Sequence, residues 1–464
     1  MNNNFIAAIV LGSSKVTGIV GSKENDGTIS VKAHIAVPSS DFIAKGRVLN
    51  VDKMTACLTT IKQTLEGITE SRIKCFYTAI GCMGLRSVPN TVTLQMPSSE
   101  VVTDELIASI GVRNKEGRTA EREIIEAIPL EYHLAGAQVT QDPKGTVTDR
   151  IEARFLNVIC GTKSLEAITN CFRRAQIDIA DGRIFVGAEL LAGIMTNEQE
   201  RSSGCAFVDM GSETTTVAVY RGKQLRHLCV VPLGSASITR DIANVFNVEY
   251  DEAENLKLKH GYPDFNNLDD QENLHLRDGG RVKKVTELAE IIDARVEEIV
   301  QNVKAQIERS GFTRDNLVNG IFVCGGGAQL KGMINAFKTH FKEWNVRIVK
   351  HSPRLKVTAS DSAFNESGIF NIGLALIDSN VTNCYGGPND LFQEERDDEQ
   401  ENGQNADTAS GGTAAEPVKA QAATEEKPEE EKPKKPKGPG AISKFLAKMK
   451  KTCIDIVSEK DERE

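Results

Sequence analysis

The chain has 464 residues, more than one hydrophobic core usually organises, so at least two domains are expected. Hydrophobic residues make up 40% of the chain and favour globular packing, while the net charge of −9 argues against general binding of nucleic acid. No apolar run approaches the roughly 20 residues that a helix needs to span a bilayer, and the N-terminus lacks the features of a signal peptide.

Two similar segments lie far apart in the sequence. The first, AIVLGSSKVTGIV, occupies residues 8–20, and the second, FVDMGSETTTVAV, occupies residues 207–219. They align with Gly12 on Gly211. Each predicts an apolar strand, a turn of small residues and a second β-rich strand. Two such hairpins suggest two lobes of related fold, although short segments of this kind also match by chance.

The segment 253–261, AENLKLKHG, predicts a helix between the second hairpin and a later glycine-rich turn. Glu254 and Lys257 are three positions apart in the sequence and would lie on the same face of that helix. Taken alone, this spacing indicates a solvated ion pair worth a few tenths of a kcal/mol.

A longer helix is predicted over residues 287–310, because acidic residues occupy its first turn and Gly311 follows its end. Apolar residues at helical spacing predict its buried stripe; they are Leu288, Ile292, Val296, Ile299 and Val303. Arg295 and Glu298 flank this stripe together, and their ordinary interpretation is a surface salt bridge.

A third glycine-rich turn follows an apolar strand in GIFVCGGGAQLKG, residues 320–332. Three consecutive glycines allow backbone angles that other residues avoid, and they permit close approach of a flat ligand. A helix beginning near Ala328 would point its positive end at that ligand. An ordinary strand-to-helix turn explains the pattern equally well. The chain has no GxxxxGK[ST] segment, so a phosphate site here would not be a P-loop.

Residues 384–440 are predicted as a disordered linker, because beyond Asn389 the sequence is rich in charge, proline and small residues. Residues 441–457, AISKFLAKMKKTCIDIV, then predict an amphipathic helix with an apolar stripe and a lysine-rich back. This pattern favours a helix lying on an anionic membrane surface. The alternative is a terminal helix that docks on its own globular domain or on a partner.

The order of these segments resembles the actin, Hsp70 and sugar-kinase superfamily, and within it the FtsA family of bacterial cell-division proteins. The resemblance covers residues 5–383 and the tail helix. Its specific signs are EREIIEAIPLEYHL (121–134), QDPKGTVTDRIEAR (141–154), VPLGSASITRDIA (231–243) and ARVEEI (294–299).

The resemblance implies an α/β, two-lobed actin-like (ribonuclease H-like) fold with an inserted FtsA-type subdomain. The implied parts are a first lobe of residues 1–85, completed by about 162–190 and 350–383; the inserted subdomain of 86–161; and a second lobe of 191–349. The linker and the tail helix complete the chain.

The resemblance also implies a nucleotide site between the lobes, with ATP and Mg²⁺ as the ligands. The residues that match the nucleotide-binding motifs are Gly12, Ser13, Ser14, Lys15, Gly211, Ser212, Thr214, Thr215, Glu254, Lys257, Gly326 and Gly327. Asp209 would lie near the metal. The family's first turn has an aspartate where this chain has Val10, which offers no oxygen to Mg²⁺.

Glu213 is a second departure, because a carboxylate beside triphosphate repels it unless the side chain turns outward or a cation screens it. The chain is therefore expected to be no enzyme, or at most a weak ATPase. The alternative functions are a phosphotransferase of the sugar-kinase type and a pilus-type actin-like adaptor.

The implied function is a cell-division protein that anchors FtsZ polymers to the cytoplasmic face of the bacterial inner membrane at the division site. Arg295 and Glu298 would contact the C-terminal peptide of FtsZ. The residues expected at the membrane are Ile442, Lys444, Phe445, Leu446, Lys448, Met449, Cys453 and Ile456. Self-association into filaments and contacts with other division proteins are also implied. Nucleic acid is not expected as a partner.

Overall fold

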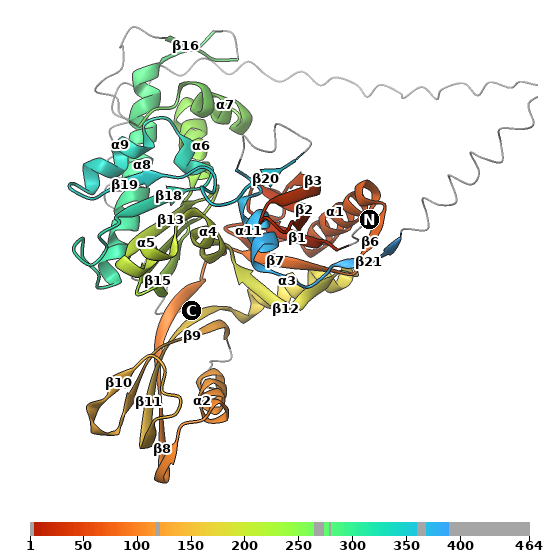
Figure 1. The fold of residues 1–464 in the computed structure, drawn as a ribbon. Helices are drawn as coiled ribbons and strands as arrows, with labels where there is room; N and C mark the ends of the chain where they lie inside the picture. Colours follow the sequence, from red (N-terminus) through yellow and green to blue (C-terminus); the bar gives the residue numbers. More distant parts are fainter. Residues whose placement is uncertain (1–3, 117–120, 264–272, 278–279, 360–367, 389–464) are drawn as a thin grey trace, which may run out of the picture.

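The computed structural model describes residues 4–116, 121–263, 273–277, 280–359 and 368–388 (Figure 1). The predicted tail helix of residues 441–457 lies outside the described residues, as does most of the predicted linker. Within the described parts of the chain, no helix combines the length and apolar character needed to cross a membrane.

The first sheet has six strands in the order β12-β7-β1-β2-β3-β20. They are β1 (Ile6–Leu11), β2 (Lys15–Lys23), β3 (Ile29–Pro38), β7 (Cys75–Ile80), β12 (Asp178–Val186) and β20 (Val357–Thr358). β1 runs antiparallel to β2 and parallel to β7. Every residue of β1 is buried, as its continuous apolar run IAAIVL predicts for a strand covered on both faces.

Helices α1 (Val51–Thr69) and α11 (Asn371–Ser379) cover opposite faces of this sheet. A side chain added at Gly18 of β2 would meet Ile61 of α1, and one added at Gly373 of α11 would meet Ile19 of β2. Adjacent residues of a strand point to opposite faces, so the two helices lie on the two sides of β2. Helix α3 (Thr162–Arg174) packs beside α1.

The second sheet has nine strands in the order β10-β9-β11-β8-β15-β14-β13-β18-β19. Its five strands in the second lobe are β13 (Cys205–Met210), β14 (Thr215–Arg221), β15 (Gln224–Val231), β18 (Ile321–Cys324) and β19 (Val346–Ile348). Successive residues of β13 belong to two cores: Phe207 belongs to the core that also includes the first lobe, while Val208 belongs to the core that includes the helices of the second lobe.

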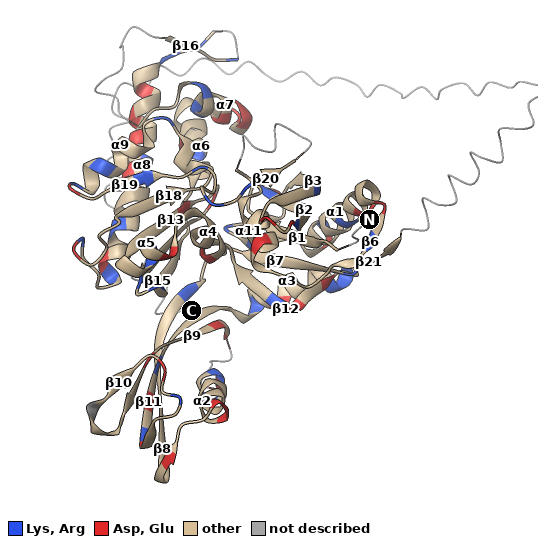
Figure 2. Ribbon diagram, viewed as in Figure 1, with Lys and Arg blue, Asp and Glu red and all other residues tan. Residues whose placement is uncertain are grey.

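The helices packed with these strands are α4 (Gly187–Met195), α5 (Glu198–Ser203), α6 (Ser235–Phe246), α7 (Tyr250–His260), α8 (Val285–Arg309) and α9 (Met333–His340). In α7 two acidic residues, Asp251 and Glu252, lie in the first turn, and the basic residues lie in the last (Figure 2). This distribution complements the helix dipole.

The remaining four strands of the second sheet form a projection that points away from the two lobes (Figure 1). They are β8 (Arg86–Val101), β9 (Arg122–Leu134), β10 (Val139–Thr140) and β11 (Val147–Gly161), with helix α2 (Asp104–Glu116) beside them. The projection has a small core of its own, which includes Ile110, Ile151 and Phe155. Its strand pairing with β15 is limited to Arg86 and Cys229, and hydrogen bonds of Ser87 with Leu228 and of Gln224 with Pro129 reinforce the connection.

The structure corrects two predicted boundaries. A helix was expected from Ala328, but a single 3-10 turn occupies Gly327–Gln329 and α9 begins at Met333, after Gly332 with φ of 82°. Tyr385–Pro388, included in the predicted linker of residues 384–440, instead forms β21, which pairs with β6 (Ser71–Ile73). The ring of Tyr385 also packs edge-on against Phe5.

Glu189, near the start of α4, lies beside Glu126 of β9, and its environment should make the stability of the fold depend on pH. Burial raises the pKa of Glu189 to about 8, and the nearby Glu126 carboxylate adds to this shift while Arg183 opposes it. Because the folded protein holds this proton more tightly than the unfolded chain, stability should fall as the pH rises from about 4.5 to about 8.

We therefore expect Glu189→Gln to raise the free energy of unfolding by about 3 kcal/mol at pH 9 and by much less at pH 5. Urea denaturation at the two pH values measures this. The exposed Glu308→Gln is the matched control and should give no pH-dependent gain. An equal effect of Glu189→Gln at both pH values would contradict the burial of a proton at this position.

Candidate functional site

The two predicted hairpins are present and their turns share one backbone hydrogen bond. The Gly12 N–H donates to the Lys15 carbonyl at 3.2 Å, and the Gly211 N–H donates to the Thr214 carbonyl at 2.8 Å. A Cβ atom would approach those carbonyl oxygens to 2.6 Å at Gly12 and 3.0 Å at Gly211. The first turn therefore requires glycine at Gly12, and the second turn leaves little room for a side chain at Gly211.

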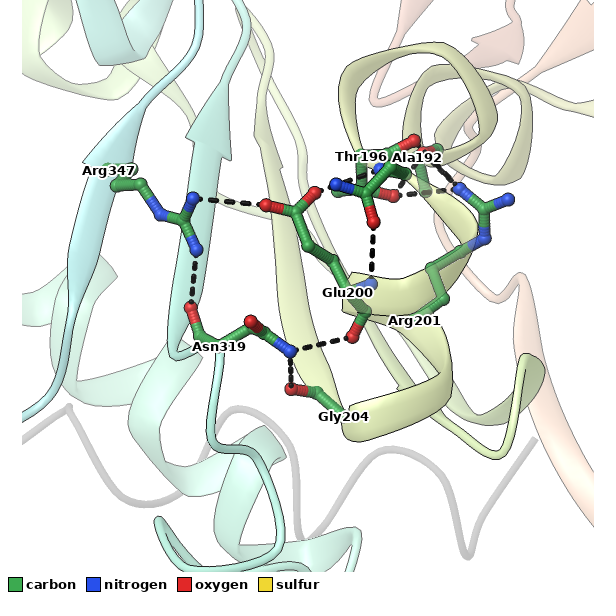
Figure 3. A network of polar contacts seen from close by, with 8 residues as sticks. Ala192, Thr196, Glu200, Arg201, Gly204, Asn319 and Arg347 are labelled. Carbon is green, nitrogen blue, oxygen red and sulfur yellow. Dashed lines mark hydrogen bonds and ion pairs between the residues drawn. The ribbon is translucent and has the colours of Figure 1, made fainter.

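The strands that lead into the second turn and into the glycine-rich turn are fixed at their opposite ends by a polar network (Figure 3). Arg347 of β19 pairs with Glu200 of α5 at 3.1 Å and donates to the Asn319 carbonyl at 3.1 Å. The Asn319 side chain donates to the carbonyls of Glu200 and Gly204. Because β13 and β18 are parallel, their carboxyl ends lie at the same edge of the sheet, opposite this network. Ligands of open α/β sheets bind at the carboxyl ends of the strands.

The first turn is held by a loop of the same lobe, residues 39–48. Ser39 donates its hydroxyl to the Gly12 carbonyl at 2.7 Å, and its N–H donates to the Ser14 carbonyl at 3.1 Å. The Ser13 hydroxyl oxygen accepts the Gly46 N–H at 2.9 Å. Ser14 and Lys15 are exposed, whereas Ser13 is buried.

The second turn is anchored to the start of α6. The Gly211 carbonyl accepts the Ser235 N–H at 3.1 Å, and the Ser212 carbonyl accepts the Ala236 N–H at 2.7 Å. Thr215 is fully buried and donates its hydroxyl to the Leu233 carbonyl at 2.8 Å. Thr215 therefore stabilises the turn through a buried hydrogen bond, and its hydroxyl proton is already donated to a carbonyl of the protein.

Glu213 is the carboxylate that sequence reasoning expected to repel phosphate. One oxygen accepts the Lys45 N–H at 2.7 Å, and the other pairs with the Arg240 guanidinium at 2.8 Å. Its side chain is only 16% exposed. The carboxylate is thus screened by a cation, which was one of the two conditions under which the turn could still accept phosphate.

Asp209 occupies the position equivalent to Val10 of the first hairpin. Burial raises the pKa of Asp209 to about 6, and the Cys324 thiol lies 3.8 Å from its carboxylate. A Cβ at Gly325, where φ is 89°, would come within 2.5 Å of the same carboxylate. Among the described residues no three metal-ligating side chains gather. A Mg²⁺ ion beside Asp209 would therefore depend on phosphate oxygens and water for its other ligands.

Lys257 is buried, so the solvated Glu254–Lys257 pair predicted from spacing is wrong. Its ammonium lies 2.7 Å from the Glu254 carboxylate and donates to the Thr239 hydroxyl at 2.9 Å and to the Ser235 carbonyl at 3.3 Å. Burial lowers the pKa of Lys257, while the Glu254 carboxylate opposes this shift. The cluster connects α7 to the start of α6 through Ser235, and the Ser235 N–H donates to the Gly211 carbonyl of the second turn.

The glycine-rich turn presents one open glycine. Gly326 is exposed, and a Cβ there would meet no atom within 4 Å. Gly327 is buried, and a Cβ there would come within 3.1 Å of the Met210 carbonyl. Gly326 therefore faces open space at the carboxyl end of β18, while Gly327 packs against the end of β13.

Arg295 and Glu298 form a largely buried cluster, so the predicted surface salt bridge is wrong. Arg295 of α8 makes a two-pronged contact to Asp241 of α6, at 2.5 and 3.0 Å, and also pairs with Glu298. The side chains of Arg295 and Glu298 are 16% and 4% exposed. Burial raises the pKa of Glu298, and Arg295 counteracts this. The cluster cross-links α6 and α8; a contact of these residues with a partner stays a prediction.

Sequence reasoning missed Lys45, Gly46 and Arg240, all of which meet the turns. The loop that carries Lys45 and Gly46 is far in sequence from Glu213, and no motif marks it. The one available signal was Glu213 itself, because a carboxylate in a turn of small residues requires a nearby donor or cation.

Comparisons with known proteins show which families and folds this chain is similar to. The family model described as "Cell division protein FtsA" matches residues 206–366, and the model described as "Type IV pilus assembly protein PilM" matches residues 82–271. The cell division protein FtsA of Escherichia coli K12 is 26% identical over 343 residues, which are 72% of this chain and 81% of that protein. The FtsA of Porphyromonas gingivalis is 27% identical over 381 residues, 80% of this chain and 78% of that protein.

Among solved structures, the PilM–PilN type IV pilus biogenesis complex matches with a TM-score of 0.55 and 15% identity. The match covers 80% of this chain and 97% of that one. This likeness concerns the fold alone, and it confirms the predicted mixed α/β, actin-like fold.

Proposed function

We propose that this chain, an FtsA-type actin-like cell-division protein, anchors FtsZ polymers to the cytoplasmic face of the membrane at the division site. One combination carries the proposal: a globular part related to FtsA proteins is followed by a sequence with amphipathic pattern at residues 441–457. A lysine-rich back and an apolar stripe suit attachment to an anionic surface rather than insertion across it.

Attachment by one short helix is marginal on its own, much as it is for a single acyl chain. Self-association of the actin-like body would place many such helices on one membrane, and their combined avidity would far exceed that of one. In this account the filament is the anchoring unit, and other division proteins are recruited to it.

Nucleotide would bind between the two turns, with its base near Gly326 of the glycine-rich turn. The open side of the site supports this placement, since Ser14, Lys15 and Gly326 are exposed. Hydrolysis should be weak, because Val10 supplies no oxygen and Asp209 is the sole carboxylate expected at a bound Mg²⁺. ATP with Mg²⁺ would then stabilise the closed lobes rather than drive repeated turnover.

A pilus-type adaptor is the second candidate, and the match of residues 82–271 to the PilM family model favours it. A small-molecule phosphotransferase has less support, because a kinase needs a carboxylate base and a well-held metal at the transferred phosphate. Partner binding separates the candidates.

The experiment is a titration of the intact protein with a fluorescent FtsZ C-terminal peptide and with a scrambled peptide of the same composition. The native peptide should bind and the scrambled peptide should not. Arg295→Lys, which keeps the charge but loses the two-pronged contact to Asp241, should weaken binding severalfold without unfolding the protein. Equal binding of both peptides would reject FtsZ as the partner.

A further inference from the structure

A short loop of the first lobe contacts both turns of the candidate site through its main chain. The loop contains β4 (Ile43–Ala44) and β5 (Arg47–Val48), joined by Lys45 and Gly46 with φ of 50° and 73°. The Gly46 N–H donates to Ser13 of its own lobe at 2.9 Å, and the Lys45 N–H donates to Glu213 of the second lobe at 2.7 Å. Two adjacent donors therefore point at the two turns.

Glu213 joins the lobes because its two oxygens have partners on different sides. One accepts the Lys45 N–H of the first lobe, and the other pairs with Arg240 of the second lobe at 2.8 Å. Arg240 is fixed in turn by a 3.2 Å hydrogen bond to the Ser237 hydroxyl. Thr214, the next residue, donates to the Gly81 carbonyl of the first lobe at 3.5 Å.

We propose that the Glu213 carboxylate latches the two lobes together and weakens the binding of a nucleoside triphosphate, by holding an anion position that a nucleotide phosphate would otherwise occupy. A backbone N–H and a guanidinium are partners that phosphate and carboxylate share. The latch itself follows from contacts within the chain. The competition with phosphate rests on the proposed nucleotide function.

The latch has two consequences. The lobes are joined without nucleotide, because the carboxylate supplies the bridging anion. A triphosphate must displace Glu213 or approach against its charge, which weakens the binding of ATP. Glu213→Ala should therefore loosen the lobes in the absence of ligand and tighten ATP binding about tenfold.

The first arm measures amide hydrogen exchange of the full-length protein without nucleotide, in the peptide that contains Lys45 and Gly46. We expect exchange at least about tenfold faster in Glu213→Ala than in the wild type. Glu343→Ala is the matched control, since it removes a surface carboxylate paired with Arg314, and it should leave this peptide unchanged. Glu213→Gln keeps an oxygen that can accept from Lys45 and should fall between the two.

The second arm titrates the same proteins with ATP and Mg²⁺ by calorimetry. Tighter binding of ATP by both Glu213 variants than by the wild type supports the competition between Glu213 and phosphate. Weaker or unchanged binding of ATP overturns it. Unchanged exchange at Lys45 in Glu213→Ala overturns the latch, whatever ATP does. Faster exchange with no ATP binding by any variant supports the latch and rejects the nucleotide function. If Glu213→Ala does not fold, Glu213→Gln decides both arms by the same criteria.

Discussion

Arg295→Glu should lower the free energy of unfolding by about 3 to 5 kcal/mol, because it breaks a buried ion pair and adds a third carboxylate to the cluster. Arg295 is the cation shared by Asp241 and Glu298, and the side chains of these two acids are 8% and 4% exposed. Without the guanidinium, both carboxylates lose their counter-charge in a poorly solvated position. The connection between α6 and α8 would be lost with it.

Urea denaturation measures this change. Lys304→Glu is the matched control, because it makes the same charge reversal at an exposed position of α8 and should cost less than about 1 kcal/mol. Similar small losses in both variants would show that the Arg295 cluster contributes little. The prediction also affects partner studies, since loss of FtsZ peptide binding in Arg295→Glu would report unfolding rather than a lost contact.

The local features of the site could be predicted from sequence because they depend on short-range rules. An apolar run followed by Gly12 or Gly211 gives a strand and a tight turn, and acidic residues followed by Gly311 mark the ends of a helix. These signals lie within a dozen residues of each other and need no knowledge of the rest of the chain.

Burial at the site could not be predicted in the same way. The spacing of Glu254 and Lys257 places them on one face of a helix, but it does not show that α6 covers that face. The same holds for Arg295 and Glu298, whose third partner, Asp241, is 54 residues away from Arg295. The exposure of a side chain is decided by tertiary packing. An i,i+3 pair of charged residues is therefore interpreted as a surface pair when the neighbouring helix is unknown.

Cross-lobe contacts are harder still. The partner of Glu213 is a main-chain N–H of Lys45, 168 residues away, and a main-chain donor leaves no mark on residue type. The 3-10 turn at Gly327–Gln329 shows a related limit: the turn ends at Leu330, and Gly332 precedes α9 with φ of 82°, but glycine in the sequence does not state which backbone angle it adopts.

Removal of the tail should strongly weaken membrane attachment. A chain ending at Pro439 lacks the apolar stripe that contains Phe445, Leu446 and Met449, together with its lysines. Because attachment combines apolar burial with attraction to anionic lipid, we expect at least about a tenfold loss of vesicle binding. Binding by the intact chain should also fall when salt is raised, since exposed charges are screened.

The measurement that tests the anchor most directly is co-sedimentation with vesicles rich in anionic lipid, under conditions in which the protein self-associates. We expect the intact chain to pellet with these vesicles and to pellet poorly with neutral ones, and we expect the chain ending at Pro439 to stay in the supernatant. Equal pelleting of the two chains, or failure of the intact chain to pellet at all, would rule out attachment through the terminal helix. If truncation lowered only the unfolding stability, the terminal helix would instead dock on its own domain.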